Sequence, residues 1–136
     1  MGYALSTTVD RPYDMVLAQV RTALADQGFG ILTEIDLKAT MKAKMDAELA
    51  PHVILGACRP PLALAALQAE PSIGLLLPCN VVVRSADEQT TVVEAVDPQT
   101  MVAMTANPAL QTVADDATSR LTAALDSLTS PPTEEE

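Results

Sequence analysis

The sequence predicts an α+β fold in which a mostly antiparallel sheet carries two long amphipathic helices on one face. Three observations lead there: period-two alternation near the N-terminus, helical spacing of apolar residues near both ends, and β-branched runs between them. Hydrophobic residues make up 49% of the 136 positions, which is ample for a core. We expect a single domain over residues 1–129 and a disordered acidic tail over 130–136.

The first two elements are a strand and a long helix. Alternate residues of Tyr3–Val9 share one face of the strand. A helix over residues 12–27 is predicted, with Asp10 as its N-cap, Pro12 in its first turn and Gly28 in the left-handed position after its end. The apolar residues at helical spacing are Val16, Val20, Ala23 and Leu24.

The middle of the chain alternates strands with short helices. Strands are predicted over residues 31–37 and Val53–Leu55, with a short helix over Lys38–Met45 between them. A helix over Leu62–Ala69 follows two prolines and is almost pure Leu and Ala. Such a helix is expected to be buried against its own core or another subunit, and a surface helix with exposed leucines is the alternative.

The last third begins with an apolar run, Ile73–Leu77, which stops at Pro78 and resumes as Val81–Val83. A turn at residues 86–89 joins this run to Thr90–Val96 as an antiparallel hairpin. A short helical turn is predicted over Gln99–Thr105, and Asn107 caps the last helix. The apolar face of that helix consists of Leu110, Val113, Ala114, Ala117, Leu121, Ala124, Leu125 and Leu128.

Charge excludes several classes of function. The formal net charge is -10, and the only aromatic residues are Tyr3, Tyr13 and Phe29, which argues against nucleic-acid binding. No apolar run is long enough to span a membrane, and no signal peptide is legible, so we expect a soluble, cytoplasmic protein. Four basic residues form a local exception that fits either a solvated face or an anion site: Lys38, Lys42, Lys44 and Arg59.

Two cysteines are the candidate reactive groups. Cys58 and Cys79 each end an apolar run beside a proline, and Arg59 would favour a thiolate if the two strand ends are neighbours. Buried structural thiols are the alternative. With no C-x-x-C pair and one histidine, His52, no metal or cofactor is expected. His52 could serve a cysteine as general base or lie at the surface, and Asp97 before Pro98 fits turn chemistry.

Four motifs in this order resemble the domain of unknown function 302 family of small bacterial and archaeal proteins. They are Gly28–Asp36, Ile54–Cys58 with Pro60, Gly74–Val83 and Val96–Pro98. The resemblance covers about residues 3–128 and implies a TATA-binding-protein-like fold of order β-α-β-β-β-β-α, with short extra helices here, and a homodimer. It implies no activity. Arg59 and His52 depart from the family pattern, which tends to have Asn and an aromatic residue at these positions.

These observations favour a non-enzymatic binding or homo-oligomeric assembly module. Its apolar groove would be walled by Leu62–Leu67 and Ile73–Leu77, and it would take a second subunit or a small apolar or anionic ligand. The expected ligand-binding residues are Cys58, Arg59, Cys79 and Asn80. The alternative is a cysteine-dependent redox, sulfur-transfer or soft-metal-handling protein in which Cys58 and Cys79 do the chemistry.

Overall fold

Five strands and several helices make up the computed structural model, which describes residues 2–129. The strands are β1 (Ala4–Val9), β2 (Gly30–Asp36), β3 (His52–Cys58), β4 (Cys79–Asp87) and β5 (Thr90–Val96). The α-helices are α1 (Tyr13–Asp26), α2 (Leu37–Met45), α3 (Pro60–Ala69), α4 (Gln99–Thr105) and α5 (Gln111–Thr129). Two 3-10 helices, η1 (Pro71–Leu76) and η2 (Pro108–Leu110), complete the list. The acidic tail expected at 130–136 lies outside the described residues.

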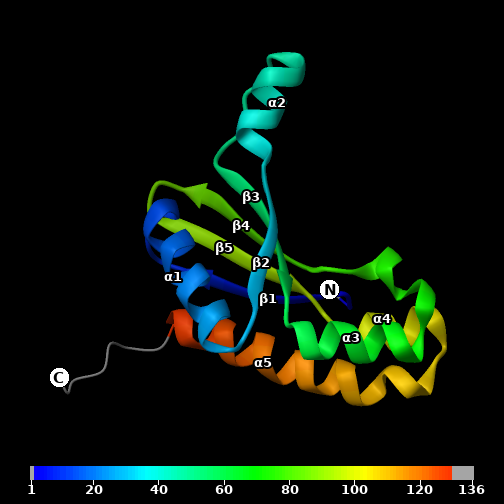
Figure 1. Ribbon diagram of the computed structural model, residues 1–136. Helices are drawn as coiled ribbons and strands as arrows, with labels where there is room; N and C mark the ends of the chain where they lie inside the picture. Colours follow the sequence, from blue (N-terminus) through cyan, green and yellow to red (C-terminus); the bar gives the residue numbers. More distant parts are fainter. Residues whose placement is uncertain (1, 130–136) are drawn as a thin grey trace, which may run out of the picture.

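All five strands pair antiparallel in the order β1-β5-β4-β3-β2, which confirms the α+β prediction. Helices α1 and α5 cover one face of this sheet, as Figure 1 shows. Within the part of the chain that the structure describes, no long helix covers the opposite face. The predicted helical faces are confirmed: every residue expected to face the core is buried in α1 and α5, as is Leu110 just before α5.

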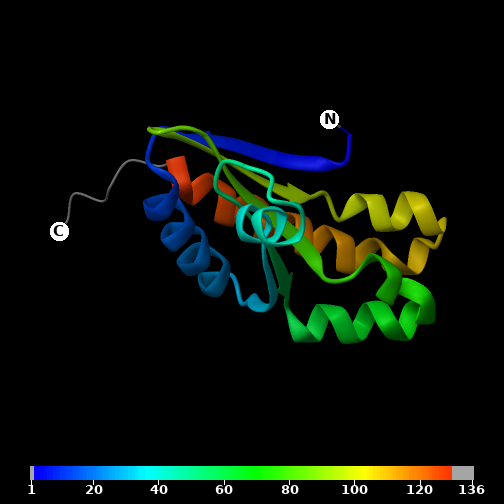
Figure 2. The same cartoon turned by 90° about the horizontal axis from the view of Figure 1, so that it is seen from above.

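The buried residues form two clusters that share α5. The larger one packs α1 and the second half of α5, including Leu121 and Leu125, against the sheet. The smaller one packs α3, η1 and α4 against the first half of α5, through residues such as Ile73 and Val113. Figures 1 and 2 both show α3, α4 and this half of α5 beyond one end of the sheet. The seam between the two clusters therefore lies where the strands end.

Helix α2 projects from the opposite end of β2 and β3, far from α5 (Figure 1), and none of its residues is buried. Asp36 caps it, because its side chain accepts a hydrogen bond from the backbone N–H of Ala39 at 2.9 Å. In the part of the chain that the structure describes, no helix is long and apolar enough to cross a membrane.

Three local expectations differ from the structure. Asp10 does not cap α1, whose N-cap position is Pro12 without a side-chain hydrogen bond. The apolar run Ile73–Leu77 does not extend the strand that follows, because Pro71 opens the 3-10 turns of η1. Helix α3 buries only Ala66 in its own core, so the expectation of full burial is wrong for the single chain. Its exposed leucines are Leu64 (58%) and Leu67 (42%).

Gly56 lies in β3, between β2 and β4, and lets side chains from both sides approach closely. A methyl group at this position would overlap the Thr33 side chain of β2 and lie 2.7 Å from Cγ of Pro78. The methyl group would lie closer to both side chains than van der Waals contact allows, and Gly56 itself is buried. Only glycine therefore fits between these two side chains.

We predict that Gly56→Ala lowers the free energy of unfolding by roughly 1–3 kcal/mol, the usual penalty of overpacking. Gly74→Ala is the matched control, because a methyl group at Gly74 would meet no atom within 4 Å. Urea unfolding of both variants measures the difference. Equal stability of the two variants would show that Thr33 and Pro78 move aside without penalty.

Candidate functional site

Strands β3 and β4 bring the two cysteines close together. In the antiparallel register Cys79, the first residue of β4, is the partner of Ala57, and Cys58 follows as the last residue of β3. Cys79 is 9% exposed and belongs to the larger core cluster, whereas Cys58 is partly exposed. Both thiols are free. The two proline-flanked strand ends are therefore neighbours, which is the condition under which Arg59 could act on a thiol.

A cavity of about 30 Å³ lies beside these residues, at the seam between the two core clusters. Its walls come from the sheet end, α3, α4 and α5, and they are apolar except for one arginine. The lining residues are Phe29, Ala57, Cys58, Arg59, Leu62, Ala63, Ala66, Leu77, Pro78, Cys79, Met101, Val113 and Ala117. This volume holds one or two atoms, well below the several hundred Å³ of a typical small-molecule site.

A cavity therefore lies where the groove was predicted, but it is much smaller than a ligand-binding groove. Leu62 and Leu77, from the two segments expected to wall it, do line the cavity. Because α3 and η1 pack against α5 through their small and aliphatic side chains, little space remains between them. A small organic ligand does not fit here.

Arg59 occupies the N-cap position of α3 and folds back over Gly28. A methyl group at Gly28 would lie 2.9 Å from Nε of Arg59, and the backbone of Gly28 has a φ of 86°. The positive φ favours glycine there, whereas the flexible Arg59 side chain could move away from a methyl group. The Nε atom is buried, and among residues 2–129 it has no hydrogen-bond partner. A buried donor without an acceptor is uncommon and calls for an explanation.

Burial raises the pKa of the Cys79 thiol to about 11, and the charge of nearby Cys58 raises it further in the same direction. Cys79 is therefore a neutral thiol at neutral pH, which makes it a poor nucleophile and a poor metal ligand. Cys58 is the only one of the two that is both partly exposed and beside the arginine. Among residues 2–129, no group of three His, Cys, Asp or Glu side chains is placed to hold a metal ion.

Asn80 does not join this group. It follows Cys79 in β4, so strand alternation sends its side chain to the other face of the sheet. There it lines a shallow hollow of about 380 Å³, together with Tyr3, Arg84 and Glu94. Of the four residues expected to bind a ligand, Cys58, Arg59 and Cys79 line one cavity and Asn80 lies elsewhere.

His52 lies at the first position of β3 and Cys58 at its last. Six residues of extended strand separate them by roughly 20 Å, so His52 cannot act as a general base for Cys58 within one chain. Asp97 has the turn role expected of it, because its side chain accepts a hydrogen bond from the backbone N–H of Gln99 at 2.9 Å.

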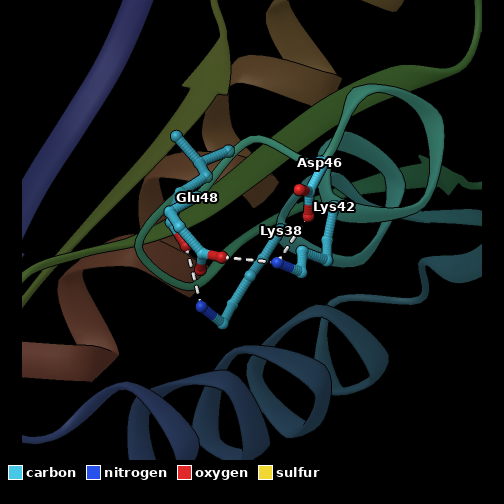
Figure 3. Close-up of polar contacts among 5 residues, drawn as sticks. Lys38, Lys42, Asp46 and Glu48 are labelled. Carbon is cyan, nitrogen blue, oxygen red and sulfur yellow. Dashed lines mark hydrogen bonds and ion pairs between the residues drawn. The ribbon is translucent and has the colours of Figure 1, made fainter.

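The four basic residues singled out in the sequence do not form one anion site. Arg59 lies beyond the far end of β3 from α2, which holds the three lysines. Figure 3 shows that Lys42 makes ion pairs with Asp46 (2.6 Å) and Glu48 (2.8 Å). Lys38 donates a hydrogen bond to the carbonyl oxygen of Leu49 at 2.9 Å (Figure 3). These contacts favour the first of the two alternatives for the lysines of α2, a solvated helix face, over an anion site.

Sequence reasoning missed most of the cavity wall. Phe29, Met101 and the α5 pair Val113 and Ala117 come from three separate parts of the chain and carry no local signal of a shared site. Gly28 had a signal, its place after a helix, but this predicted only the left-handed backbone and not the contact with Arg59.

We predict that the protein loses stability between pH 9 and 11 because of Cys79. The unfolded thiol ionises near 9.0 and the folded one near 11, so rising pH favours the unfolded chain. The loss is roughly 2–3 kcal/mol over this interval. Urea unfolding at several pH values measures it, and Cys79→Ala removes this part of the decline. An identical pH dependence in wild type and variant would contradict the burial argument.

Comparison with known proteins supports the family and the fold. The family described as "Domain of unknown function DUF302" matches residues 5–128. The crystal structure of an uncharacterized conserved DUF302 protein from Bacillus stearothermophilus is 28% identical in sequence, with a TM-score of 0.84. The match covers 93% of this chain and 98% of that one. No curated protein matches the sequence. The chain belongs to the family of domain of unknown function DUF302.

Proposed function

We propose that this protein is a non-enzymatic assembly module that pairs with a second copy of itself through the uncovered face of its sheet. The observation that carries this proposal is the aliphatic centre of that face. Strand alternation places Ile54, Val82, Val92 and Val96 there, all partly exposed. Ile35 of the edge strand β2, which pairs with Ile54, is 45% exposed. A contiguous apolar surface of this kind is typical of an interaction site.

The charges of the same face support a second copy as the partner. Among the described residues, Glu94 is the only carboxylate at the centre of the face, and Nε of Arg84 pairs with it at 3.2 Å. The face is therefore close to neutral, although the whole chain has a net charge of -10. Two copies repel one another over most orientations, and a neutral apolar face gives the least repulsive contact.

The size of the face also suits a dimer. Five strands spaced by about 4.8 Å and roughly 20 Å long present roughly 500 Å² per copy. A pair then buries roughly 1,000 Å², which is where specific interfaces begin. The shallow hollow of about 380 Å³ near Tyr3 and Asn80 gives side chains of the second copy a place to enter.

We predict that wild-type protein sediments as a dimer and that Val82→Glu shifts it to monomer. The introduced carboxylate has no partner and adds to Glu94 of the neighbouring strand, so the dissociation constant rises roughly 30-fold or more. Leu64→Glu, on the exposed side of α3, is the matched control and leaves the dimer intact. Analytical ultracentrifugation measures both. A monomeric wild type, or dissociation by Leu64→Glu, would refute pairing through the sheet face.

A second candidate function is cysteine-dependent redox or sulfur chemistry. The specific observation in its favour is the cavity that Cys58, Cys79 and Arg59 line together. Nε of Arg59 is also buried, and it has no acceptor among residues 2–129. A guanidinium beside a thiol stabilises the thiolate, which is the reactive form. Cys58 is the reacting group in this candidate, since Cys79 stays protonated.

We predict that iodoacetamide at neutral pH modifies Cys58 in the native protein and Cys79 only after unfolding. Cys58 is partly exposed, whereas Cys79 is buried and its pKa is about 11. Peptide mass spectrometry with and without urea distinguishes the two sites, and Cys58→Ser abolishes native modification. If both cysteines need urea before they react, both are inert core thiols and this second candidate fails.

Two further assignments complete the proposal. The element order supports a TATA-binding-protein-like arrangement, which carries no expectation of DNA binding in a chain with a net charge of -10. A cytoplasmic location is supported by the cysteine usage, because two cysteines outside any paired framework suit a reducing compartment.

A further inference from the structure

The lysines of this chain are confined to one helix. All three of them, Lys38, Lys42 and Lys44, lie on α2, which has no acidic residue and therefore a charge of +3. The whole chain has a net charge of -10. Lys42 is paired with carboxylates beside the helix (Figure 3), but among residues 2–129 neither Lys38 nor Lys44 has a carboxylate within ion-pair distance. Two positive charges of α2 are therefore uncompensated in the single chain.

Helix α2 also lacks the packing that usually stabilises a short helix. It has nine residues, none of them buried, and it projects beyond the sheet (Figure 1). A helix of this length is marginal in water by itself, and in most proteins the burial of one face supplies the missing stability. Met45, in its last turn, is 68% exposed. A surface that covered α2 would stabilise it, and a surface of opposite charge suits its lysines.

Three exposed carboxylates lie at the same end of the sheet as α2. His52, where β3 begins, pairs with Arg84, so β4 ends on this side with Asp87, and Glu88 follows in the turn to β5. Strand β1 also ends here, because it is antiparallel to β5, and Asp10 comes directly after it. Asp10, Asp87 and Glu88 are exposed, and no cation of the described residues pairs with them. We call these three carboxylates the acidic end of the sheet.

We propose that α2 of one copy docks through its lysines on the acidic end of a second copy of this chain. This inference rests on the proposed pairing of the sheet faces. A two-fold axis that runs along the strands brings the same ends of both sheets together and sets β2 of one copy over β1 of the other. Helix α2, which extends from β2, then lies beside Asp10 and the turn with Asp87 and Glu88 of the second copy.

Charge complementarity selects this arrangement over the other one that pairs the same faces. A two-fold axis across the strands would place α2 beside the opposite end of the second sheet, where α3 begins. Helix α3 has no charged residue, so the lysines would gain no partner there. With the axis along the strands, each copy gives its lysines to the acidic end of the other, and the contact forms twice. Two chains of net charge -10 thereby gain an attractive path of approach.

The first test is carbodiimide cross-linking of the full-length protein, which joins a lysine amine to a carboxylate as an amide with loss of water. Because every lysine of the chain lies on α2, each such amide reports where α2 lies. Isotope-labelled and unlabelled chains are mixed and allowed to exchange before the reagent is added. Mass spectrometry is expected to find α2 peptides of one label joined to peptides of the acidic end with the other label. The internal control is the amide between Lys42 and Glu48, which should never mix labels.

The second test reverses charges on both sides of the contact. Lys44→Glu should raise the dissociation constant of the dimer about tenfold, because an exposed attraction becomes a repulsion at two places in the dimer. Glu88→Lys should weaken the dimer to a similar extent, although it brings the net charge closer to zero. The double variant Lys44→Glu with Glu88→Lys should return to within about threefold of wild type, since the ion pair is restored with its charges exchanged. Analytical ultracentrifugation measures each constant.

Arg21→Glu is the matched control for Lys44→Glu. It gives the chain the same net charge, but Arg21 lies on α1, on the covered side of the sheet, where it pairs with Glu34. It should leave the dissociation constant within about threefold of wild type. Combined with Glu88→Lys, it should not restore the dimer. Thermal unfolding of each variant confirms that it is folded before dissociation constants are compared.

Three results would overturn the docking of α2: cross-links from α2 only within one chain, cross-links between copies that avoid the acidic end, or no rescue in the double variant. If any of these occurs in a dimer that Val82→Glu still dissociates, the pairing of the sheet faces stands and only this inference fails. A monomeric wild type removes both.

Discussion

The close approach of three strands at Gly56 is the constraint on which the rest of the structure depends. Thr33 of β2 and Pro78 before β4 both lie over this glycine, so β2, β3 and β4 reach the same end of the sheet together. That convergence sets Ala57 opposite Cys79 and leaves Cys58 as the last residue of its strand. Helix α3 starts two residues later. The missing side chain of Gly56 thus permits the close packing of Thr33 and Pro78 at the sheet end where the thiols and the cavity lie.

The sequence predicted the elements whose pattern is local and failed where the deciding contact is distant. The buried stripes of α1 and α5 follow from residue spacing alone. The N-cap of α1 does not follow from spacing, because the segment before the helix is bound to strand β5. Thr91 of β5 donates a hydrogen bond to the carbonyl oxygen of Arg11 at 2.9 Å. Helix α3 has no polar stripe to mark its exposed side, so its composition could not show that Leu64 faces solvent.

At the candidate site, too, features with a local sequence pattern could be predicted and features set by distant contacts could not. The sequence marked Cys58 and Cys79 as two proline-flanked strand ends, but it left open whether the two strands are neighbours, and the pairing of β3 with β4 answers that. Asn80 was grouped with them on sequence proximity, but one residue along a strand reverses the face. The wall of the cavity could not be predicted, because Phe29, Met101 and Ala117 meet only after α5 has packed across both clusters.

Arg59 is where the sequence departs furthest from what stability alone would select. A buried N–H without an acceptor costs about 1–3 kcal/mol, a substantial share of the roughly 5–15 kcal/mol that holds a domain of this size together. An aliphatic residue over Gly28 would avoid that penalty and fill the space. Departures of this kind gather at functional positions, where a missing partner is supplied by something the fold itself lacks. Arg59 lines the same cavity as Cys58, the partly exposed one of the two cysteines, and that is the physical reason to look for chemistry at Cys58.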